Sequence, residues 1–139
     1  MRRPINILLI EDDYLDQVEV QRIMDKRAIL YKIKIAKNGE EGLQLLRERT
    51  SSAFSGPPDI ILLDLNMPKM NGFEFLQNLT TVELNDSKVF VLTTSDQQED
   101  MVMARHLRIS GFITKPLKLE SPSSLDAFNL MIDLMNMQS

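Results

Sequence analysis

The stretch Ile5-Asn6-Ile7-Leu8-Leu9-Ile10 decides the fold class, because it is almost entirely aliphatic and shows no alternation with charged residues. A short aliphatic run of this kind is typical of a strand that is buried on both faces, as strands are in parallel sheets. The run ends at the acidic triplet Glu11-Asp12-Asp13, and apolar residues then recur at helical spacing through residues 14–27. A buried strand followed by a helix is the repeating unit of an α/β fold.

The same unit recurs along the chain. Two further aliphatic runs, Ile60–Leu63 and Val89–Leu92, predict buried strands, whereas Tyr31–Ala36 alternates apolar residues with lysine and predicts a strand with one polar side. The expected strands are residues 5–10, 31–36, 60–63, 89–92 and 112–114, and the expected helices are residues 14–27, 39–49, 73–79, 97–108 and 125–135. Regular alternation predicts a five-stranded parallel sheet with helices on both faces.

The bulk properties of the chain fit one soluble domain. Its 139 residues are about the size of an average domain, so we expect a single domain over residues 1–139, with a core at about 4–137 and no output domain. There is no cysteine, which excludes disulfides and thiolate metal sites. The net charge of −4 does not favour nucleic-acid binding. No apolar run approaches the length of a membrane span, so we expect a cytoplasmic protein without membrane contacts.

Acidic residues follow two of the expected strands. In open α/β sheets the functional crevice lies beyond the carboxyl ends of the strands, where Glu11, Asp12 and Asp64 would converge. Two unit charges about 4 Å apart repel by roughly 4 kcal/mol at an effective dielectric constant of about 20, so such a cluster must bind a proton, a cation or a basic side chain. Hard oxygen ligands suit Mg²⁺. The alternative interpretation is that Asp12 or Asp13 caps the following helix.

Asp64 is the candidate nucleophile of this edge of the sheet. A carboxylate can attack a phosphoryl group and hold it as an aspartyl phosphate. Thr93 and Lys115 stand at the ends of the fourth and fifth expected strands. The hydroxyl of Thr93 and the ammonium of Lys115 could contact the oxygens of such a group. Taken singly, each of the three residues also fits an ordinary structural role, and it is their joint placement that favours phosphoryl chemistry.

Four segments carry a resemblance to a known family. They are Leu8–Asp13 (LLIEDD), Asp64–Gly72 (DLNMPKMNG), Thr93–Ser95 (TTS) and Gly111–Pro116 (GFITKP). In this order and spacing, they resemble the receiver domain of two-component response regulators, and the likeness runs over nearly the whole chain. The resemblance implies a flavodoxin-like, doubly wound (βα)₅ fold.

The resemblance also implies a metal site. Asp64 would be the phosphoacceptor and, together with Asp12 and the backbone carbonyl of Asn66, a direct ligand of Mg²⁺. Glu11 would act on the metal through water. Glu11 stands where the family more often has Asp, so its carboxylate reaches further.

A second set of implied roles concerns the response to phosphorylation. Thr93 would be the switch hydroxyl that moves toward the phosphoryl group, and Lys115 would contact that group. Phe112 stands where the family has an aromatic residue whose rotamer follows the switch, although packing in the core is an alternative interpretation. The bond from Lys115 to Pro116 is expected to be cis.

The function that the resemblance implies is signalling. The chain would accept a phosphoryl group on Asp64, in a Mg²⁺-dependent reaction, from a sensor histidine kinase or a histidine phosphotransfer protein. It would then signal to a downstream protein effector by a conformational change. It would not be an enzyme beyond catalysing its own phosphorylation and dephosphorylation. It would be a monomer or a phosphorylation-dependent homodimer.

Three other functions are less consistent with these residues. A phosphohydrolase that uses an aspartyl phosphate needs an acid two residues after the nucleophile, where this chain has Asn66. An FMN carrier of flavodoxin type needs a phosphate-binding loop after the first strand, and Glu11-Asp12-Asp13 has the wrong charge for it. A degenerate receiver that serves only as a binding module is disfavoured by the intact Asp64, Thr93 and Lys115.

Overall fold

The computed structural model describes residues 4–27, 30–48, 57–65, 72–79, 87–94 and 109–115, and of Phe73, Thr93, Thr94 and Thr114 it describes the backbone. The expected helices at residues 97–108 and 125–135 lie outside these ranges. In chain order the described elements are β1 (Ile5–Ile10), α1 (Tyr14–Lys26), β2 (Tyr31–Ala36), α2 (Gly39–Arg47), β3 (Ile60–Asp64), α3 (Gly72–Asn78), β4 (Lys88–Thr94) and β5 (Gly111–Lys115).

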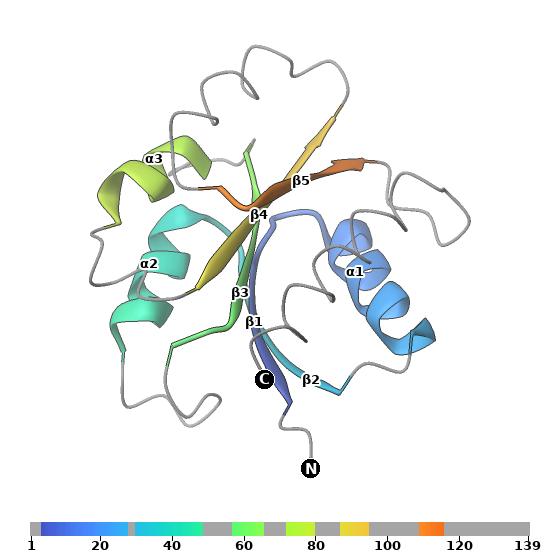
Figure 1. Ribbon diagram of the computed structural model, residues 1–139. Coiled ribbons are helices and arrows are strands. Elements are labelled where there is room, and N and C mark those ends of the chain that lie inside the picture. Colours follow the sequence, from blue (N-terminus) through green and yellow to red (C-terminus); the bar gives the residue numbers. More distant parts are fainter. Residues whose placement is uncertain are drawn as a thin grey trace.

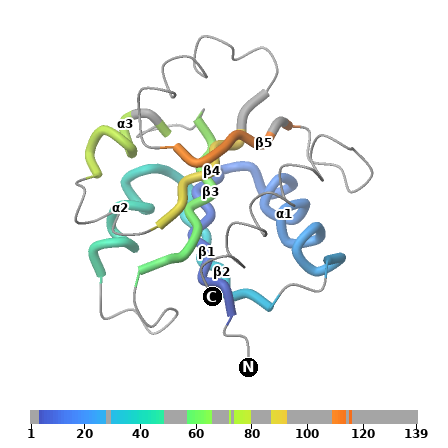
Figure 2. Tube along the Cα trace, viewed as in Figure 1, coloured from blue at the N-terminus to red at the C-terminus, as the bar shows by residue number. Residues whose placement is uncertain are grey.

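The five strands form one parallel sheet in the order β2-β1-β3-β4-β5. In strand β1, Leu9 lies opposite Ile35 of β2 on one side and opposite Leu62 of β3 on the other. The trace in Figure 2 follows the chain from β1 out to β2 and then back across β1 to β3. Figure 1 shows α1 on one side of the sheet and α2 with α3 on the other. The predicted doubly wound α/β architecture is confirmed.

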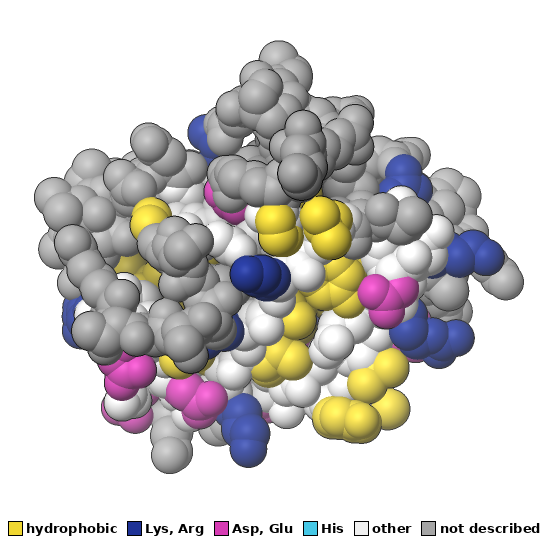
Figure 3. All heavy atoms as spheres, turned by 90° about the horizontal axis from the view of Figure 1, so that it is seen from below, with side chains coloured by type: hydrophobic (Ala, Val, Ile, Leu, Met, Phe, Trp, Pro, Cys, Tyr) yellow, Lys and Arg dark blue, Asp and Glu magenta, His cyan; other side chains and the backbone are white. Residues whose placement is uncertain are grey.

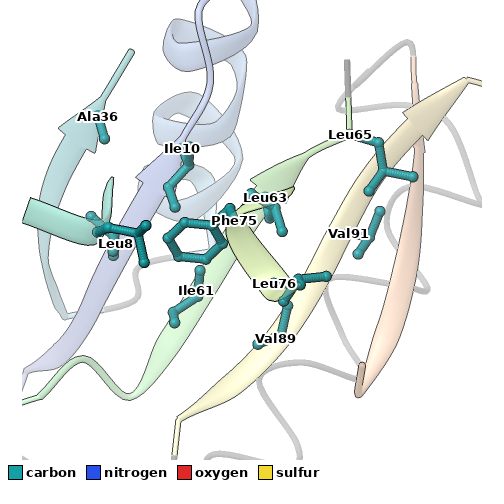
Figure 4. Close-up of a cluster of buried hydrophobic side chains, with 11 residues drawn as sticks. Leu8, Ile10, Ala36, Ile61, Leu63, Leu65, Phe75, Leu76, Val89 and Val91 are labelled. Atoms are coloured by element: carbon teal, nitrogen blue, oxygen red, sulfur yellow. The ribbon is translucent and has the colours of Figure 1, made fainter. Parts of the chain in front are cut away.

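Alternate residues of the buried strands supply two hydrophobic cores. In β1, Ile7 and Leu9 point into the cluster that contains Val20, Ile23 and Met24 of α1. Their neighbours point to the opposite face, because successive side chains of a strand alternate between the two sides of a sheet. Figure 4 shows this second cluster, in which the ring of Phe75 lies among aliphatic side chains of the sheet; its fully or nearly fully buried members are Leu8, Ile10, Ala36, Leu43, Ile61, Leu63, Leu65, Phe75, Leu76, Val89 and Val91.

Helix α1 begins at a side-chain cap. The carboxylate of Asp13 accepts a hydrogen bond of 2.9 Å from the backbone N–H of Leu15, which satisfies one of the free donors of the first helical turn. The helix buries Val20, Ile23 and Met24. Leu15, which the apolar spacing also assigned to this helix, is 72% exposed because it lies on the side away from the sheet.

Helix α2 is capped in the same way and packs against the sheet through Gly42. The side chain of Asn38 accepts a hydrogen bond of 2.9 Å from the N–H of Glu41. A Cβ atom on Gly42 would lie only 2.6 Å from Cδ1 of Ile10, so a larger residue here would require the Ile10 side chain to shift. The helix ends at Arg47, two residues before the predicted end. Among the described residues, no helix is long and apolar enough to cross a membrane.

Candidate functional site

The register of the sheet brings three strand ends to one edge. Ile10 of β1 lies opposite Leu63 of β3, and Asp64 is the next residue of β3 and its last. Lys115 is the last residue of β5 and lies opposite Thr94 of β4. From β1 the chain goes first to β2 on one side and then to β3 on the other, so the strand order reverses between β1 and β3. Open α/β sheets bind their ligands at such a switch point.

Three carboxylates gather at this edge. Glu11, Asp12 and Asp64 each offer an oxygen, and these oxygens all lie within 4.8 Å of one another. Glu11 is fully buried, Asp64 is 5% exposed, and Asp12 is exposed to solvent. Carboxylate oxygens that lie this close, with one side open to water, form a set of ligands that could hold a hard divalent cation.

Lys115 is the counter-ion of the cluster. Its Nζ atom lies 2.6 Å from Oε1 of Glu11 and 2.8 Å from Oδ2 of Asp16, but 3.4 Å from Oδ2 of Asp64. The contact with Glu11 is a close charge contact rather than an oriented hydrogen bond, because Oε1 is buried and has no partner of hydrogen-bond geometry. One ammonium therefore faces several carboxylates, and the site carries an excess of negative charge.

The pKa values of Glu11 and Lys115 are both raised at this site. Burial, and next the hydrogen bond and charge of Asp64, raise the pKa of Glu11 to about 8 against the opposing effect of the Lys115 ammonium. Burial on its own lowers the pKa of Lys115, but the carboxylates of Asp16, Glu11 and Asp64 outweigh burial and raise that pKa above its ordinary value. The excess of negative charge contributes to both shifts, because more carboxylates than ammonium groups meet at this edge of the sheet.

Backbone contacts hold Glu11 in place. Its N–H donates to the carbonyl of Ala36 at 2.9 Å, and its own carbonyl accepts a hydrogen bond of 2.8 Å from the side-chain amide of Gln17. One oxygen of its carboxylate accepts a weaker hydrogen bond of 3.2 Å from the N–H of Asp13. The turn from β1 into α1 is thereby tied both to the neighbouring strand β2 and to α1.

Gly72 lets the start of α3 lie close against the end of β3, next to Asp64. A Cβ atom at this position would lie 2.6 Å from the carbonyl oxygen of Asp64 and 2.8 Å from Cα of Leu65. The N–H of Gly72 donates to the carbonyl of Leu65 at 3.2 Å. Because both close contacts are with backbone, a larger residue would force the start of α3 away from the end of β3.

The structure brings together four of the residues that the sequence assigned to the site: Glu11, Asp12, Asp64 and Lys115. The side chain of Thr93, together with Asn66 and Pro116, lies outside the described part of the chain, so their assigned roles stay predictions. Phe112 is partly buried and packs against the cluster on the side of α2 and α3. This position agrees with packing in the core, and the switch role of Phe112 also stays a prediction.

Two residues of α1 belong to the site although no sequence motif pointed to them. Asp16 pairs with Lys115, and Gln17 binds the carbonyl of Glu11. Acidic residues are common in the first turn of a helix because they are attracted to the positive end of the helix dipole. The presence of Asp16 there therefore did not indicate a role in the site. Its position three residues after the cap Asp13 could have been noticed, since residues in one turn after a strand end can face back toward that end.

Comparison with known proteins decides the family. A family model described as "Response regulator receiver domain" matches residues 7–122. The chain belongs to the response regulator receiver family. This range covers β1 through β5, apart from the first two residues of β1, and with them every residue of the acidic cluster and Lys115.

Individual relatives agree with the family model. The nitrate/nitrite response regulator protein NarL of Escherichia coli is 34% identical over 86% of this chain, which spans about half (51%) of NarL's own length. The response regulator Rcp1 of Synechocystis is 32% identical over 84% of this chain and 80% of Rcp1. Among solved structures, a two-component response regulator from Legionella pneumophila is 37% identical with a TM-score of 0.74, covering 93% of this chain and 98% of the other.

Proposed function

We propose that this receiver accepts a phosphoryl group on the carboxylate of Asp64, in a Mg²⁺-dependent reaction, and passes the signal on by a change of conformation. The observation that carries the proposal is the position of Asp64. Its carboxylate ends β3 at the switch point of the sheet, beside two further carboxylates and within 3.4 Å of the ammonium of Lys115. A nucleophile, candidate cation ligands and a counter-ion for phosphoryl oxygens therefore share one small site.

The step itself is a displacement at phosphorus. An oxygen of Asp64 forms a bond to the phosphorus of the donor, and the bond from phosphorus to the imidazole nitrogen of a phosphohistidine breaks. The nitrogen leaves with the bonding electron pair and is neutral or takes a proton from solvent. Lys115 lies close enough to contact the transferred oxygens and offset their charge, and the Thr93 hydroxyl is the proposed second donor.

Asp12 and Asp64, together with the backbone carbonyl of Asn66, are the proposed direct ligands of Mg²⁺, with Glu11 acting through water. The fit rests on the convergent oxygens of Glu11, Asp12 and Asp64 and on the buried Oε1 of Glu11, which lacks an oriented hydrogen bond. When bound, the ion supplies neutralisation of the charge on the phosphoryl oxygens. Glu11 and Asp12 keep that side of the site anionic, which disfavours anion binding in the absence of a cation.

The proposed donor is a sensor histidine kinase or a histidine phosphotransfer protein, and the proposed recipient of the signal is a protein partner. Phosphorylation turns a carboxylate with one charge into a group with close to two charges. Lys115 ends the edge strand β5, so a change in its contacts acts directly on the end of that strand. The resulting shift between two conformations is what a partner would recognise.

Intact-mass spectrometry tests the proposal. Protein incubated with Mg²⁺ and acetyl phosphate should gain the mass of one phosphoryl group, and the gain should be absent with EDTA and in Asp64→Asn. Asp13→Asn is the matched control, because it removes a carboxylate from the same edge while asparagine caps a helix as well as aspartate does. Uptake by Asp64→Asn, or no uptake by the unaltered protein from either acetyl phosphate or a phosphorylated histidine donor, would overturn the proposal.

A further inference from the structure

Asp16 contributes a fourth carboxylate to the site, from an element that carries none of the proposed ligands. It lies in the first turn of α1, and its Oδ2 atom is 2.8 Å from Nζ of Lys115. Glu11 and Asp64 reach the same ammonium from the ends of β1 and β3, whereas Asp16 reaches it from α1, the helix on one side of the sheet in Figure 1. The side chain of Lys115 is only 12% exposed, and within the described ranges these three carboxylates are the acidic groups paired with it.

The distances show where the ammonium is drawn. It lies 0.6 Å closer to Asp16 than to the phosphoacceptor Asp64, since the two separations are 2.8 and 3.4 Å. The ammonium is therefore placed toward Asp16 and Glu11 rather than toward Asp64. Lys115 is therefore engaged elsewhere at the point where a phosphoryl group would arrive on Asp64.

The exposure of the three carboxylates shows which contact can yield. The side chain of Asp16 is 22% exposed, against 0% for Glu11 and 7% for Asp64. A buried charge that loses its partner is strongly destabilised, whereas a charge with access to water is solvated instead. Of the three contacts, the one between Lys115 and Asp16 is thus the easiest to break.

We propose that Asp16 is a positioning residue of the phosphorylation site, which competes with the phosphoryl group for Lys115 and so weakens the hold of the site on that group. The inference rests on the proposed function, because it assumes that Lys115 contacts a phosphoryl group on Asp64. On this account Asp16 holds Lys115 back in the unphosphorylated protein and releases it to the phosphoryl oxygens. Its removal should favour the phosphorylated conformation.

Binding of beryllofluoride, a stable mimic of the phosphoryl group, tests this inference without a donor protein. The titration is carried out with Mg²⁺ and followed by ¹⁹F NMR. Asp16→Asn keeps the shape of the side chain and removes its charge, and it should bind the mimic about fivefold more tightly, which corresponds to about 1 kcal/mol. Asp16→Glu, which restores the carboxylate, should return the affinity to within about twofold of the unaltered protein.

Asp13→Asn separates the contact with Lys115 from a general effect of charge. It removes one negative charge three residues from Asp16, and the side chain of Asp13 contacts the start of α1 rather than Lys115. Its affinity should stay within about twofold of the unaltered protein. An equal gain in Asp13→Asn, an unchanged or lower affinity in Asp16→Asn, or a failure of Asp16→Glu to restore the affinity would overturn the inference alone. Absence of binding to the unaltered protein, together with absence of phosphoryl uptake, would overturn the proposed function and the inference with it.

Discussion

The two ends of the sheet bury polar groups in opposite ways. At the end where the strands begin, Asn6 and Asp59 form a reciprocal pair: the N–H of Asp59 donates to the carbonyl of Asn6 at 2.8 Å, and the N–H of Asn6 donates to the Asp59 carboxylate at 2.9 Å. Close by, the hydroxyl of Ser87 donates to the carbonyl of Pro58. At the end where the strands finish, buried Glu11 lies among like charges and keeps one oxygen without an oriented hydrogen bond.

We call the end with Asn6 and Asp59 the structural end, and the end with Glu11, Asp64 and Lys115 the functional end. Buried polar groups stabilise a fold when each has a partner, and they destabilise it when like charges crowd together. The pair of Asn6 and Asp59 follows the first case, whereas the carboxylates around Lys115 follow the second. A bound cation would relieve this crowding, because it places positive charge among the carboxylates.

The surface of the structural end agrees with this division. Figure 3 views the molecule from below Figure 1, the side from which β1 begins, and shows described side chains of both charge signs around a central group of hydrophobic ones. Neither sign dominates among the side chains drawn in that view. A one-sided accumulation of charge is found instead at the carboxyl ends of the strands, where Glu11, Asp12, Asp16 and Asp64 face Lys115.

The largest expected effect is at the structural end. Asp59→Ala removes the acceptor for the N–H of Asn6, and leaving a partly buried donor unsatisfied should lower the free energy of unfolding by about 2 kcal/mol. Asp59→Asn is the matched control, because its amide oxygen can still accept the bond and the loss should be smaller. Urea denaturation measures both. Phosphoryl uptake on Asp64 should be unchanged in folded Asp59→Ala; a selective loss of uptake there would mean that the two ends are not separate.

The sheet could be predicted because the evidence for it is local. Aliphatic runs such as Ile60–Leu63 mark strands that are buried on both faces, and the residues that follow such runs reach a common edge in any parallel sheet. That rule is sufficient to predict that Glu11, Asp64 and Lys115 lie close together. The strand ends are displaced by only one or two residues, as in β3, which includes Asp64.

The contribution of α1 could not be predicted, because the rotation of a helix about its axis depends on how it packs. Apolar spacing assigned Leu15 to this helix but did not show which way its side chain faces, and it is 72% exposed. The packing of Val20, Ile23 and Met24 instead sets the helix so that Asp16 reaches Lys115. For the same reason the sequence paired Lys115 with a phosphoryl group and did not foresee which carboxylates would hold it beforehand.

Magnesium should stabilise the folded protein by binding among the carboxylates at the carboxyl ends of the strands. A ligand that binds only the folded state at ten times its Kd stabilises that state by about 1.4 kcal/mol. Thermal unfolding of the unaltered protein should therefore shift upward as Mg²⁺ is added, whereas Asp12→Asn, which lacks one proposed ligand, should show little shift at the same concentration. Asp13→Asn should shift like the unaltered protein. An equal shift in all three proteins would place the bound ion elsewhere.

A smaller effect is expected from the phosphoacceptor itself. Without Mg²⁺, Asp64→Asn should raise the free energy of unfolding by about 1 kcal/mol, because it removes one of the crowded carboxylates while Lys115 keeps Glu11 and Asp16 as partners. The sign is opposite to that expected for Asp59→Ala. Urea denaturation in EDTA gives the comparison, and a loss of stability in Asp64→Asn would show that attraction to Lys115 outweighs repulsion at this position.

The smallest expected effect is a change of stability with pH, caused by the hydrogen bond between Tyr31 and Asp25. The hydroxyl of Tyr31, at the start of β2, donates to Asp25 of α1 at 2.9 Å. Burial, and next the hydrogen bond and charge of Asp25, raise the pKa of Tyr31 to about 12. Because the folded protein holds this proton more tightly than the unfolded chain, the contribution of Tyr31 is complete below about pH 10, the ordinary pKa of tyrosine, and is lost as the pH rises toward 12.

Tyr31→Phe should therefore be less stable than the unaltered protein by about 0.5 kcal/mol at pH 8, a small value because the pair is largely exposed to solvent. The gap should be unchanged at pH 9 and should narrow at pH 10 and 11, because the tyrosine of the unfolded chain then loses its proton while the variant has no proton to lose. Asp25→Asn separates the hydrogen bond from the charge repulsion. Its amide oxygen still accepts the hydrogen bond, but it carries no charge to repel the tyrosinate. A gap between Tyr31→Phe and the unaltered protein that stays constant to pH 11 would assign the stabilisation to packing of the ring rather than to the bond with Asp25.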